Sequence, residues 1–163
     1  MKKSAENKVL CMQPVPQTIV SCRGKDGHNN ALVVGFAANA SLDPAMVIVG
    51  ITPERFSHHL VKESGCFVIN LPKKSFKKEY GYLGSKSGRD GDKFEALGLK
   101  WENGTSVDAP ILTDCPVNIE CRVIQSIQPG THELFVATVE TVHVDEEYLD
   151  DKGNILWGKM DLM

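Results

Sequence analysis

Apolar residues fall in short runs along the chain, and the length of these runs is typical of β-strands. Residues 31–38 and 45–51 form two such runs, which a Leu-Asp-Pro turn signal at residues 42–44 separates. Ahead of them, residues 18–36 read as a hairpin around the segment 24–30, which is rich in Gly, Asn and Asp. The first third of the chain therefore predicts paired β-strands.

A helix is predicted after the second apolar run, followed by a further strand over residues 66–71. Thr52-Pro53 can start the helix, because Thr caps helices and Pro fits the first helical position; Ser57 is a second candidate cap. Gly65 is expected to end it. We expect the rest of the chain to be organised around this unit of strand, turn, strand, helix and strand over residues 30–70.

The next segment is polar, and it predicts helices separated by a charged loop. One helix is expected to begin within residues 73–78, and Asp92 is placed to cap a short helix that ends at Gly98. The loop between them is rich in Gly and carries the cations Lys86, Arg89 and Lys93. Such a loop is either an anion-binding site or an ordinary solvated surface loop.

The last third of the chain alternates apolar and polar residues, which is the pattern of half-buried antiparallel strands. Residues 117–127 and 132–145 show it, with a Pro-Gly turn at residues 129–130 between them. About six or seven strands with few helices indicate an antiparallel β-barrel with helical decoration.

Length and charge narrow the function classes. In a chain of 163 residues, 42% of them hydrophobic, we expect a single domain over residues 1–163, in which residues 1–11 form a loose N-terminal arm. The net charge of −3 and the lack of a basic tract argue against nucleic acid or an anionic membrane as partners. The apolar runs are too short to span a membrane and no signal peptide is visible, so we expect a cytoplasmic protein.

Several catalytic and metal-binding motifs are missing from the sequence. It has no G-x-S-x-G, P-loop, H-E-x-x-H or G-x-G-x-x-G motif. The five cysteines are odd in number and include no C-x-x-C pair, and the neighbouring His58 and His59 are poorly spaced for one metal ion. We expect no metal site, and we expect the cysteines to be free thiols.

Two features suggest a ligand that has an anionic end and a flat apolar end. Arg55 and Ser57 lie at or near the start of the predicted helix, where free N–H groups and the helix dipole already favour an anion. Residues 37–41 end a strand with small side chains, which allow a flat ligand to approach the backbone. The alternative is an ordinary strand–helix unit with a surface Arg and a helix cap.

Six stretches, in this order and spacing, resemble the flavin reductase-like family of FMN-binding split barrels, and within it the flavoredoxin branch. The stretches are Asn30-x-x-x-x-Gly35-Phe36, Ser41-Leu-Asp-Pro44, Ile51-x-Pro-x-Arg55-Phe-Ser57-His58, Ser64-Gly-x-Phe67-Val-Ile-Asn70, Ser87-Gly-Arg-Asp-x-Asp92-Lys93-Phe94 and Gly130-Thr-His132-x-Leu-Phe-Val136. The resemblance covers about residues 12–145.

The resemblance implies a mainly β fold, a Greek-key split β-barrel with a few peripheral α-helices, which forms a homodimer with FMN near the interface. Asn30 matches a residue at the polar edge of the flavin ring, while Arg55, Ser57 and His58 match the phosphate end. His132 is implied as the catalytic residue on the open side of the ring. The full set of implied cofactor-binding residues is Asn30, Phe36, Ala38, Asn39, Ala40, Ser41, Arg55, Ser57, His58, Lys93 and His132.

The function implied is that of an FMN-binding oxidoreductase, which passes electrons from NADH, NADPH or a redox partner protein through FMN to flavin, ferric iron or a protein. The alternative is a flavoredoxin-type electron carrier that does not oxidise NAD(P)H directly. Val33 departs from the family, which often has Thr there, and His132 has the alternative of a surface histidine at a strand end. Hydride transfer needs mainly positioning, so the lack of a catalytic triad is no objection.

Overall fold

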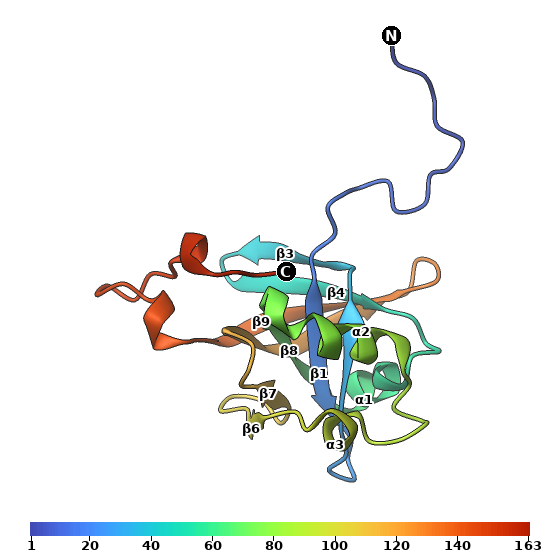
Figure 1. Cartoon of the computed structure of the whole chain (residues 1–163). Coiled ribbons are helices and arrows are strands. Elements are labelled where there is room, and N and C mark those ends of the chain that lie inside the picture. Colours follow the sequence, from blue (N-terminus) through green and yellow to red (C-terminus); the bar gives the residue numbers. More distant parts are fainter.

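The computed structural model describes all 163 residues, and an antiparallel seven-stranded sheet forms most of it (Figure 1). The strands lie in the order β2-β1-β5-β8-β9-β4-β3. Their bounds are β1 (Thr18–Arg23), β2 (Asn29–Val34), β3 (Ala37–Leu42), β4 (Ala45–Ile51), β5 (Cys66–Leu71), β8 (Val117–Ile127) and β9 (Glu133–Val144). A second, two-stranded sheet pairs β6 (Trp101–Asn103) with β7 (Pro110–Leu112). The mainly β architecture expected from the sequence is confirmed.

Short helices lie outside the sheet. They are α1 (Phe56–Ser64), α2 (Lys77–Ser85), α3 (Lys93–Leu97) and the 3-10 turns η1 (Lys74–Phe76), η2 (Glu146–Tyr148) and η3 (Trp157–Lys159). α1 packs mainly on β1, whereas α2 and α3 pack on β2 (Figure 1). None of the helices has the length and apolar character needed to cross a membrane.

The apolar run at residues 31–38 is divided between two strands, which corrects the single strand expected there. The chain bends at Gly35-Phe36, and β2 and β3 on either side of the bend lie at opposite edges of the sheet. Hydropathy does not mark the bend, because apolar side chains are needed on both sides of it. The N–H of Gly50, near the end of β4, donates to the Phe36 carbonyl at 2.7 Å and ties the bend to that strand.

The signals that end the helices mostly act as expected. Gly65 follows α1 with a left-handed φ of 69°, and Asp92 caps α3 by accepting hydrogen bonds from the N–H groups of its first turn. The start of α1 differs from the sequence prediction, because Thr52-Pro53 lies in the preceding turn. Arg55, with an extended backbone, takes the cap position, and Ser57 lies inside the first turn.

β2 separates two hydrophobic clusters, because its side chains alternate between two faces. Leu32 and Val34 point into the barrel, in the cluster that holds Phe67. Ala31 faces the other way and packs with Leu83 and other side chains beneath α2 and α3. Burying a large apolar side chain stabilises a fold by about 1.5–3 kcal/mol, so these two clusters hold β2 rigidly between them.

The N-terminal segment is exposed, and the cysteines are free thiols, as the sequence predicts for them. Residues 1–11 have exposed side chains only, and the N-terminal arm projects away from the barrel (Figure 1). All five cysteines are free, and all except Cys11 are buried. Burial raises the pKa of the Cys22, Cys115 and Cys121 thiols to about 12, so these side chains remain neutral.

Candidate functional site

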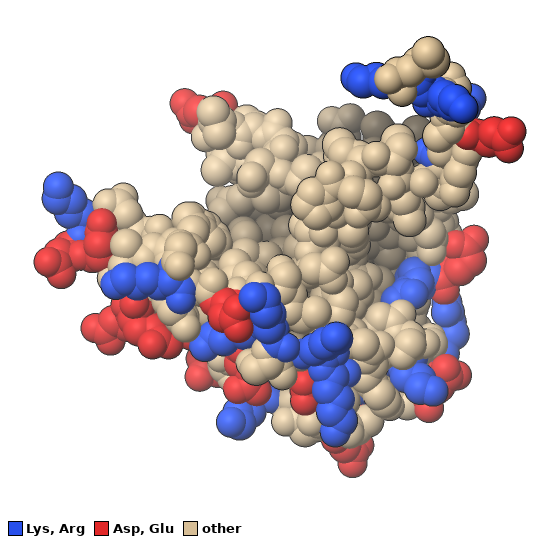
Figure 2. Space-filling model, turned by 45° about the horizontal axis from the view of Figure 1, so that its top comes forward, with Lys and Arg blue, Asp and Glu red and all other residues tan.

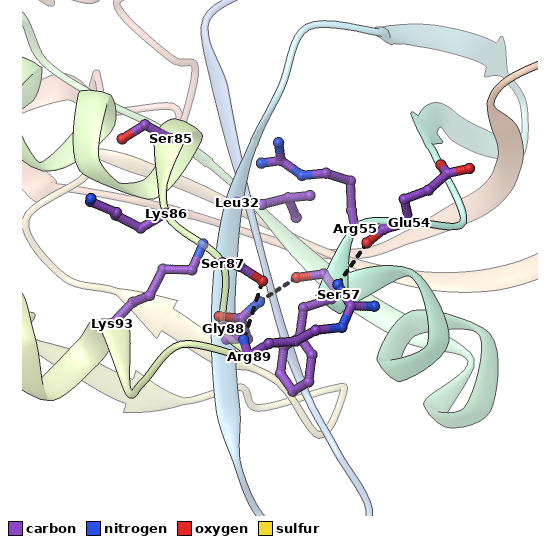
Figure 3. A pocket seen from close by; sticks show the side chains of 12 residues that line it. Leu32, Glu54, Arg55, Ser57, Ser85, Lys86, Ser87, Gly88, Arg89 and Lys93 are labelled. Carbon is purple, nitrogen blue, oxygen red and sulfur yellow. Dashed lines mark hydrogen bonds between the residues drawn. The ribbon is translucent and has the colours of Figure 1, made fainter.

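A cavity of about 190 Å³ lies between β2, the start of α1 and the loop that joins α2 to α3. Four cationic side chains line it, and we call it the cationic cavity: Arg55, Lys86, Arg89 and Lys93. Glu54 is the acidic residue of the lining, and its carboxylate points away from the centre (Figure 3). The cavity therefore concentrates positive charge.

Lys93 is the most deeply buried of these cations. Its residue is only 3% exposed, because the cap at Asp92 starts α3 with this side chain turned toward β2. The ammonium donates to the carbonyls of Ala31 at 2.7 Å and Leu83 at 3.1 Å, and it forms no ion pair with a carboxylate. Burial, helped by repulsion from Arg55, lowers the pKa of Lys93 to about 8. A buried cation of this kind favours an anionic ligand.

Arg55 enters the cavity from the side opposite Lys93 (Figure 3). Its Nη2 donates a hydrogen bond to the carbonyl of Gly84 at 3.2 Å. Like Lys93, it forms no ion pair with a carboxylate. No side chain caps the N-terminus of α1, which begins one residue later. The partial positive charge of that helix end therefore adds to the two cations.

Asn30 forms the floor of the cavity from β2. It is 1% exposed, and its Nδ2 donates to the Ser57 hydroxyl at 2.7 Å. Its Oδ1 is buried without a hydrogen-bond partner. With the amide turned over, Nδ2 would be the unpaired atom instead, so in either orientation one polar atom is left for a ligand.

Gly88 lies directly against this amide. A Cβ at position 88 would come 2.7 Å from Asn30 Oδ1 and closer still to the ring of Phe56. Only a residue without a side chain fits there. The loop can therefore lie close to β2 and close this side of the cavity.

A second cavity of about 320 Å³ shares Leu32 and Arg55 with the first, and we call it the apolar cavity. Most of its wall comes from the end of β2, the bend at Gly35-Phe36 and the end of β4. The rings of Phe36 and His132 meet edge to face there, with centroids 4.4 Å apart and planes at 78°. The joined cavities suit a ligand with an anion at one end and a flat apolar group at the other.

The structure brings together six of the residues expected to bind a cofactor, in two groups. The cationic cavity contains Asn30, Arg55, Ser57 and Lys93, and the apolar cavity contains Phe36 and His132, with Arg55 in both. The two separate anion sites considered from the sequence, one at Arg55 and one in the charged loop, are a single cavity. Sequence analysis missed Leu32 and the role of Gly88, because only the packing of the loop on β2 reveals them.

The remaining expected residues lie elsewhere in the chain. The Nε2 of His58 is 2.6 Å from the buried Glu133 carboxylate, and its ring packs near Phe135. Consecutive helical residues point about 100° apart, so His58 does not face the cavity that contains Ser57. Ala38, Asn39, Ala40 and Ser41 lie on the edge strand β3, and none of them lines the cationic or the apolar cavity.

Comparison with known proteins points the same way as this geometry. The family described as "Flavin reductase like domain" matches residues 12–159. A ferric-chelate reductase (NAD(P)H) of Archaeoglobus fulgidus is 30% identical over 122 residues, which cover 74% of this chain and 68% of that protein. Flavoredoxin of Desulfovibrio vulgaris is 30% identical with a TM-score of 0.87, over 95% of this chain and 82% of that chain. Flavoredoxin of Methanosarcina acetivorans is 27% identical with a TM-score of 0.91, over 99% and 85%.

The family match includes every strand of the barrel, and both flavoredoxin structures share the fold over nearly the whole chain. The resemblance found in the sequence and the split-barrel fold are therefore confirmed. The chain belongs to the flavin reductase-like domain family.

Proposed function

We propose that the chain binds FMN across the two joined cavities and acts as an oxidoreductase. It would pass electrons from NAD(P)H or a redox partner through the flavin to an acceptor. The observation that carries this proposal is the buried Lys93 ammonium, which has no carboxylate partner and lies in the wall of a cavity that continues into an apolar one. FMN has the matching chemistry, because it joins a phosphate to a flat ring.

The phosphate end is assigned to Lys93, Arg55 and the N-terminus of α1. These groups supply two full charges and free N–H groups within one small cavity. Asn30 offers an unpaired acceptor, which suits a hydroxyl of the ribityl chain between phosphate and ring. This assignment moves Asn30 from the polar edge of the ring, where the family resemblance put it, to the sugar-like chain.

The ring end is assigned to the apolar cavity. Phe36 and His132 form one wall there, and the Nδ1 of His132 pairs with the Thr131 hydroxyl at 2.9 Å. The Nε2 of His132 has no partner within the chain and is free to contact the ring or a second substrate. Bound FMN supplies the chemistry of accepting a hydride and releasing electrons, while the residues of the chain bind, orient and shield it.

A second candidate function is that of an electron carrier that exchanges electrons with proteins and does not oxidise NAD(P)H. The similarity to two flavoredoxin structures supports it. The similarity to a ferric-chelate reductase whose name includes NAD(P)H supports the reductase.

We also propose that two copies associate through the face formed by β3 and the C-terminal tail. An apolar groove of about 480 Å³ lies there, with Ala38 and Trp157 among its lining residues. The face turned forward in Figure 2 is hollowed and has few charged side chains at its centre. A homodimer of this kind would bring Ala38, Asn39, Ala40 and Ser41, which the resemblance implies as cofactor-binding residues, near the partner subunit.

The visible absorption spectrum of the purified protein, with and without NADH in the absence of oxygen, tests these proposals. A yellow protein that NADH bleaches supports the reductase. A yellow protein that only dithionite bleaches supports the carrier. A protein that stays colourless after FMN is added and the excess removed would refute the flavin proposal altogether.

A further inference from the structure

A buried carboxylate that lines neither cavity, that of Glu133, is connected to both of them. Glu133 is the first residue of β9 and is 4% exposed. Its neighbour in the chain, His132, lies in the wall of the apolar cavity. Its hydrogen-bond partner His58 lies in the first turn of α1, next to Ser57 of the cationic cavity. Glu133 therefore joins the element at one end of the site to the element at the other end.

Three side chains hold the Glu133 carboxylate. The Nε2 of His58 lies 2.6 Å from Oε2, the Nζ of Lys62 donates to both oxygens at 3.1 Å and 3.2 Å, and the Ser126 hydroxyl donates to Oε1 at 2.7 Å. The hydrogen bond from Ser126 first, and then those from Lys62 and His58, outweigh the effect of burial and lower the pKa of Glu133 to about 2. The ionised carboxylate can only accept hydrogen bonds, so the Nε2 of His58 is the donor.

These partners differ in what they connect to Glu133. Ser126 lies near the end of β8, which already pairs with β9 along a ladder of hydrogen bonds. His58 and Lys62 connect the carboxylate to α1, which packs on β1, β2 and β5. The Lys62 side chain is 59% exposed, and exposed ion pairs contribute little. His58 is buried, and its ring packs near that of Phe135 on β9, with centroids 5.6 Å apart. It is therefore the buried link between β9 and the helix.

The separation of the two ends of the site depends on this link. In the proposed function, Arg55 and the free N–H groups at the start of α1 bind the phosphate, while His132 lies at the ring. A ligand that spans both cavities contacts both ends at once, and a misplacement of about 1 Å can cost about a hundredfold in rate. A buried ion pair is weak evidence for stability, since apolar side chains of similar volume often replace one without loss. Positioning explains this pair better than stability does.

Resting on the FMN proposal above, we propose that Glu133 is a positioning residue of the flavin site. Through His58 it fixes the first turn of α1, and through its own place at the start of β9 it fixes His132. It lines neither cavity, so it acts on the flavin only through these two residues. It holds the phosphate end and the ring end at the separation that FMN requires.

The test removes two hydrogen bonds of the same carboxylate, one that connects to α1 and one that does not. His58→Leu removes the link to the helix. Ser126→Ala is the matched control, because it removes a hydrogen bond of similar length within the sheet. His58→Gln keeps an N–H donor on a side chain of similar length and should restore the link.

Two measurements read the two ends of the site separately. FMN titration reads the phosphate end. The rate at which NADH bleaches the flavin at saturating FMN, together with the visible circular dichroism of bound FMN, reads the ring end. Urea unfolding of each variant measures the loss of stability, so that it can be compared with the loss of function.

We expect His58→Leu to raise the FMN dissociation constant and to lower the bleaching rate, each by about tenfold, because the two ends shift relative to each other. Ser126→Ala should change each quantity by less than about twofold, because α1 keeps its place. His58→Gln should bind FMN and react with NADH nearly as the wild type does, and should show the wild-type circular dichroism.

The remaining outcomes overturn the assignment in distinguishable ways. If His58→Leu and Ser126→Ala impair binding and bleaching equally, in step with their loss of stability, the pair is only structural. If FMN affinity falls but the bleaching rate and the circular dichroism stay as in the wild type, Glu133 does not couple the two ends. In both cases the FMN proposal stands. If the wild-type chain binds no FMN, the proposed function itself fails. If it binds FMN that NADH does not bleach, the electron carrier is supported, and the circular dichroism alone decides the role of Glu133.

Discussion

At the scale of single residues, Lys93 connects the pH of the solution to ligand binding. Its pKa of about 8 lies below its ordinary value of 10.5, so the charged form is disfavoured in the folded chain without a ligand. Between these two values the unfolded chain holds one more proton than the folded chain, and the contribution of Lys93 to stability therefore rises with pH. A bound anion reverses the preference, because it favours the charged form.

We predict that FMN affinity falls as the pH rises through 8. The second pKa of a phosphate ester is about 6, so the ligand keeps its charge over this range and only the protein loses one. The dissociation constant should rise about tenfold between pH 7 and pH 9. Fluorescence titrations across this range measure it, and Lys93→Met should remove the dependence. An unchanged constant in the wild-type chain would exclude Lys93 from the phosphate site.

Arg55 supports a second prediction, because its guanidinium lies in both cavities and forms no ion pair. Arg55→Ala should weaken FMN binding by about 1.5–3 kcal/mol, the loss expected for a charge-assisted hydrogen bond. Titration with FMN measures this loss, and Lys78→Ala is the control for a removed surface cation. A dissociation constant equal to that of the control would remove Arg55 from the phosphate site.

His132 supports a third prediction, which separates chemistry from cofactor retention. His132→Ala should lower the rate of NADH oxidation about tenfold or more, because it removes a group that positions the reacting ring. FMN affinity should change by less than about 1 kcal/mol, since only one contact at the edge of the ring is lost. Rapid-mixing absorbance and FMN titration provide the two numbers. Equal losses in both would show that the histidine is structural.

At the scale of elements, Glu120 joins a loop to the sheet. It is fully buried on β8 and accepts hydrogen bonds from the backbone N–H groups of Thr105, Ser106 and Val107, and it pairs with His143 on β9 at 2.5 Å. Burial alone would raise the pKa of Glu120, but the hydrogen bonds from His143, Ser106 and Thr105 outweigh it and lower the pKa to about 2.

We predict that Glu120→Gln destabilises the fold by about 3 kcal/mol. The Gln amide has an NH2 donor where the carboxylate has an acceptor oxygen, so N–H groups of the loop lose an acceptor and face a donor instead. Urea unfolding measures the difference, and Glu63→Gln at an exposed position of α1 is the control. The depressed pKa means that the carboxylate stabilises the fold above its ordinary value of 4.5 and loses this effect as the pH falls toward 2. The difference in unfolding free energy between the wild type and Glu120→Gln should become smaller as the pH falls from 4.5 toward 2. A difference that stayed constant would contradict the stabilising role of the Glu120 carboxylate.

Elements with local signals could be predicted from the sequence, and elements that depend on packing could not. Asp92 and Gly65 mark helix ends through contacts within a few residues, and the structure agrees with both. The bend at Gly35-Phe36 has no local signal, since apolar residues lie on both sides of it.

The candidate site shows the same division. The sequence indicates which residues could bind an anion. It does not show that Arg55 and Lys93 line the same cavity, because this depends on how α3 packs on β2. His58 belongs to the same family motif as Ser57, but its ring pairs with Glu133 at the start of β9. The helical period already separates it from Ser57.

At the scale of the whole molecule, the apolar groove beside β3 predicts self-association. Val142 lines it and is 43% exposed in one chain. We predict a dimer in solution, and Val142→Asp should convert it to a monomer by placing a charge in the interface. Light scattering after gel filtration measures the mass. Ile124→Asp is the matched control, because Ile124 is also an exposed strand residue, 53% exposed, but lies outside the groove. A wild-type monomer would contradict the proposal.

The bend between β2 and β3 has a consequence for the barrel as a whole. These two strands are the free edges of the sheet, and no ladder of hydrogen bonds pairs them. They are connected by the turn at Gly35-Phe36, which the hydrogen bond from the Gly50 N–H to the Phe36 carbonyl attaches to β4. The apolar cavity is lined by β2, by the bend itself and by the end of β4. A ligand bound there would contact both β2 and the end of β4, and would connect these two parts of the barrel. Under the proposed function, flavin binding therefore also stabilises the closed barrel, because a ligand that binds only the folded state raises its stability.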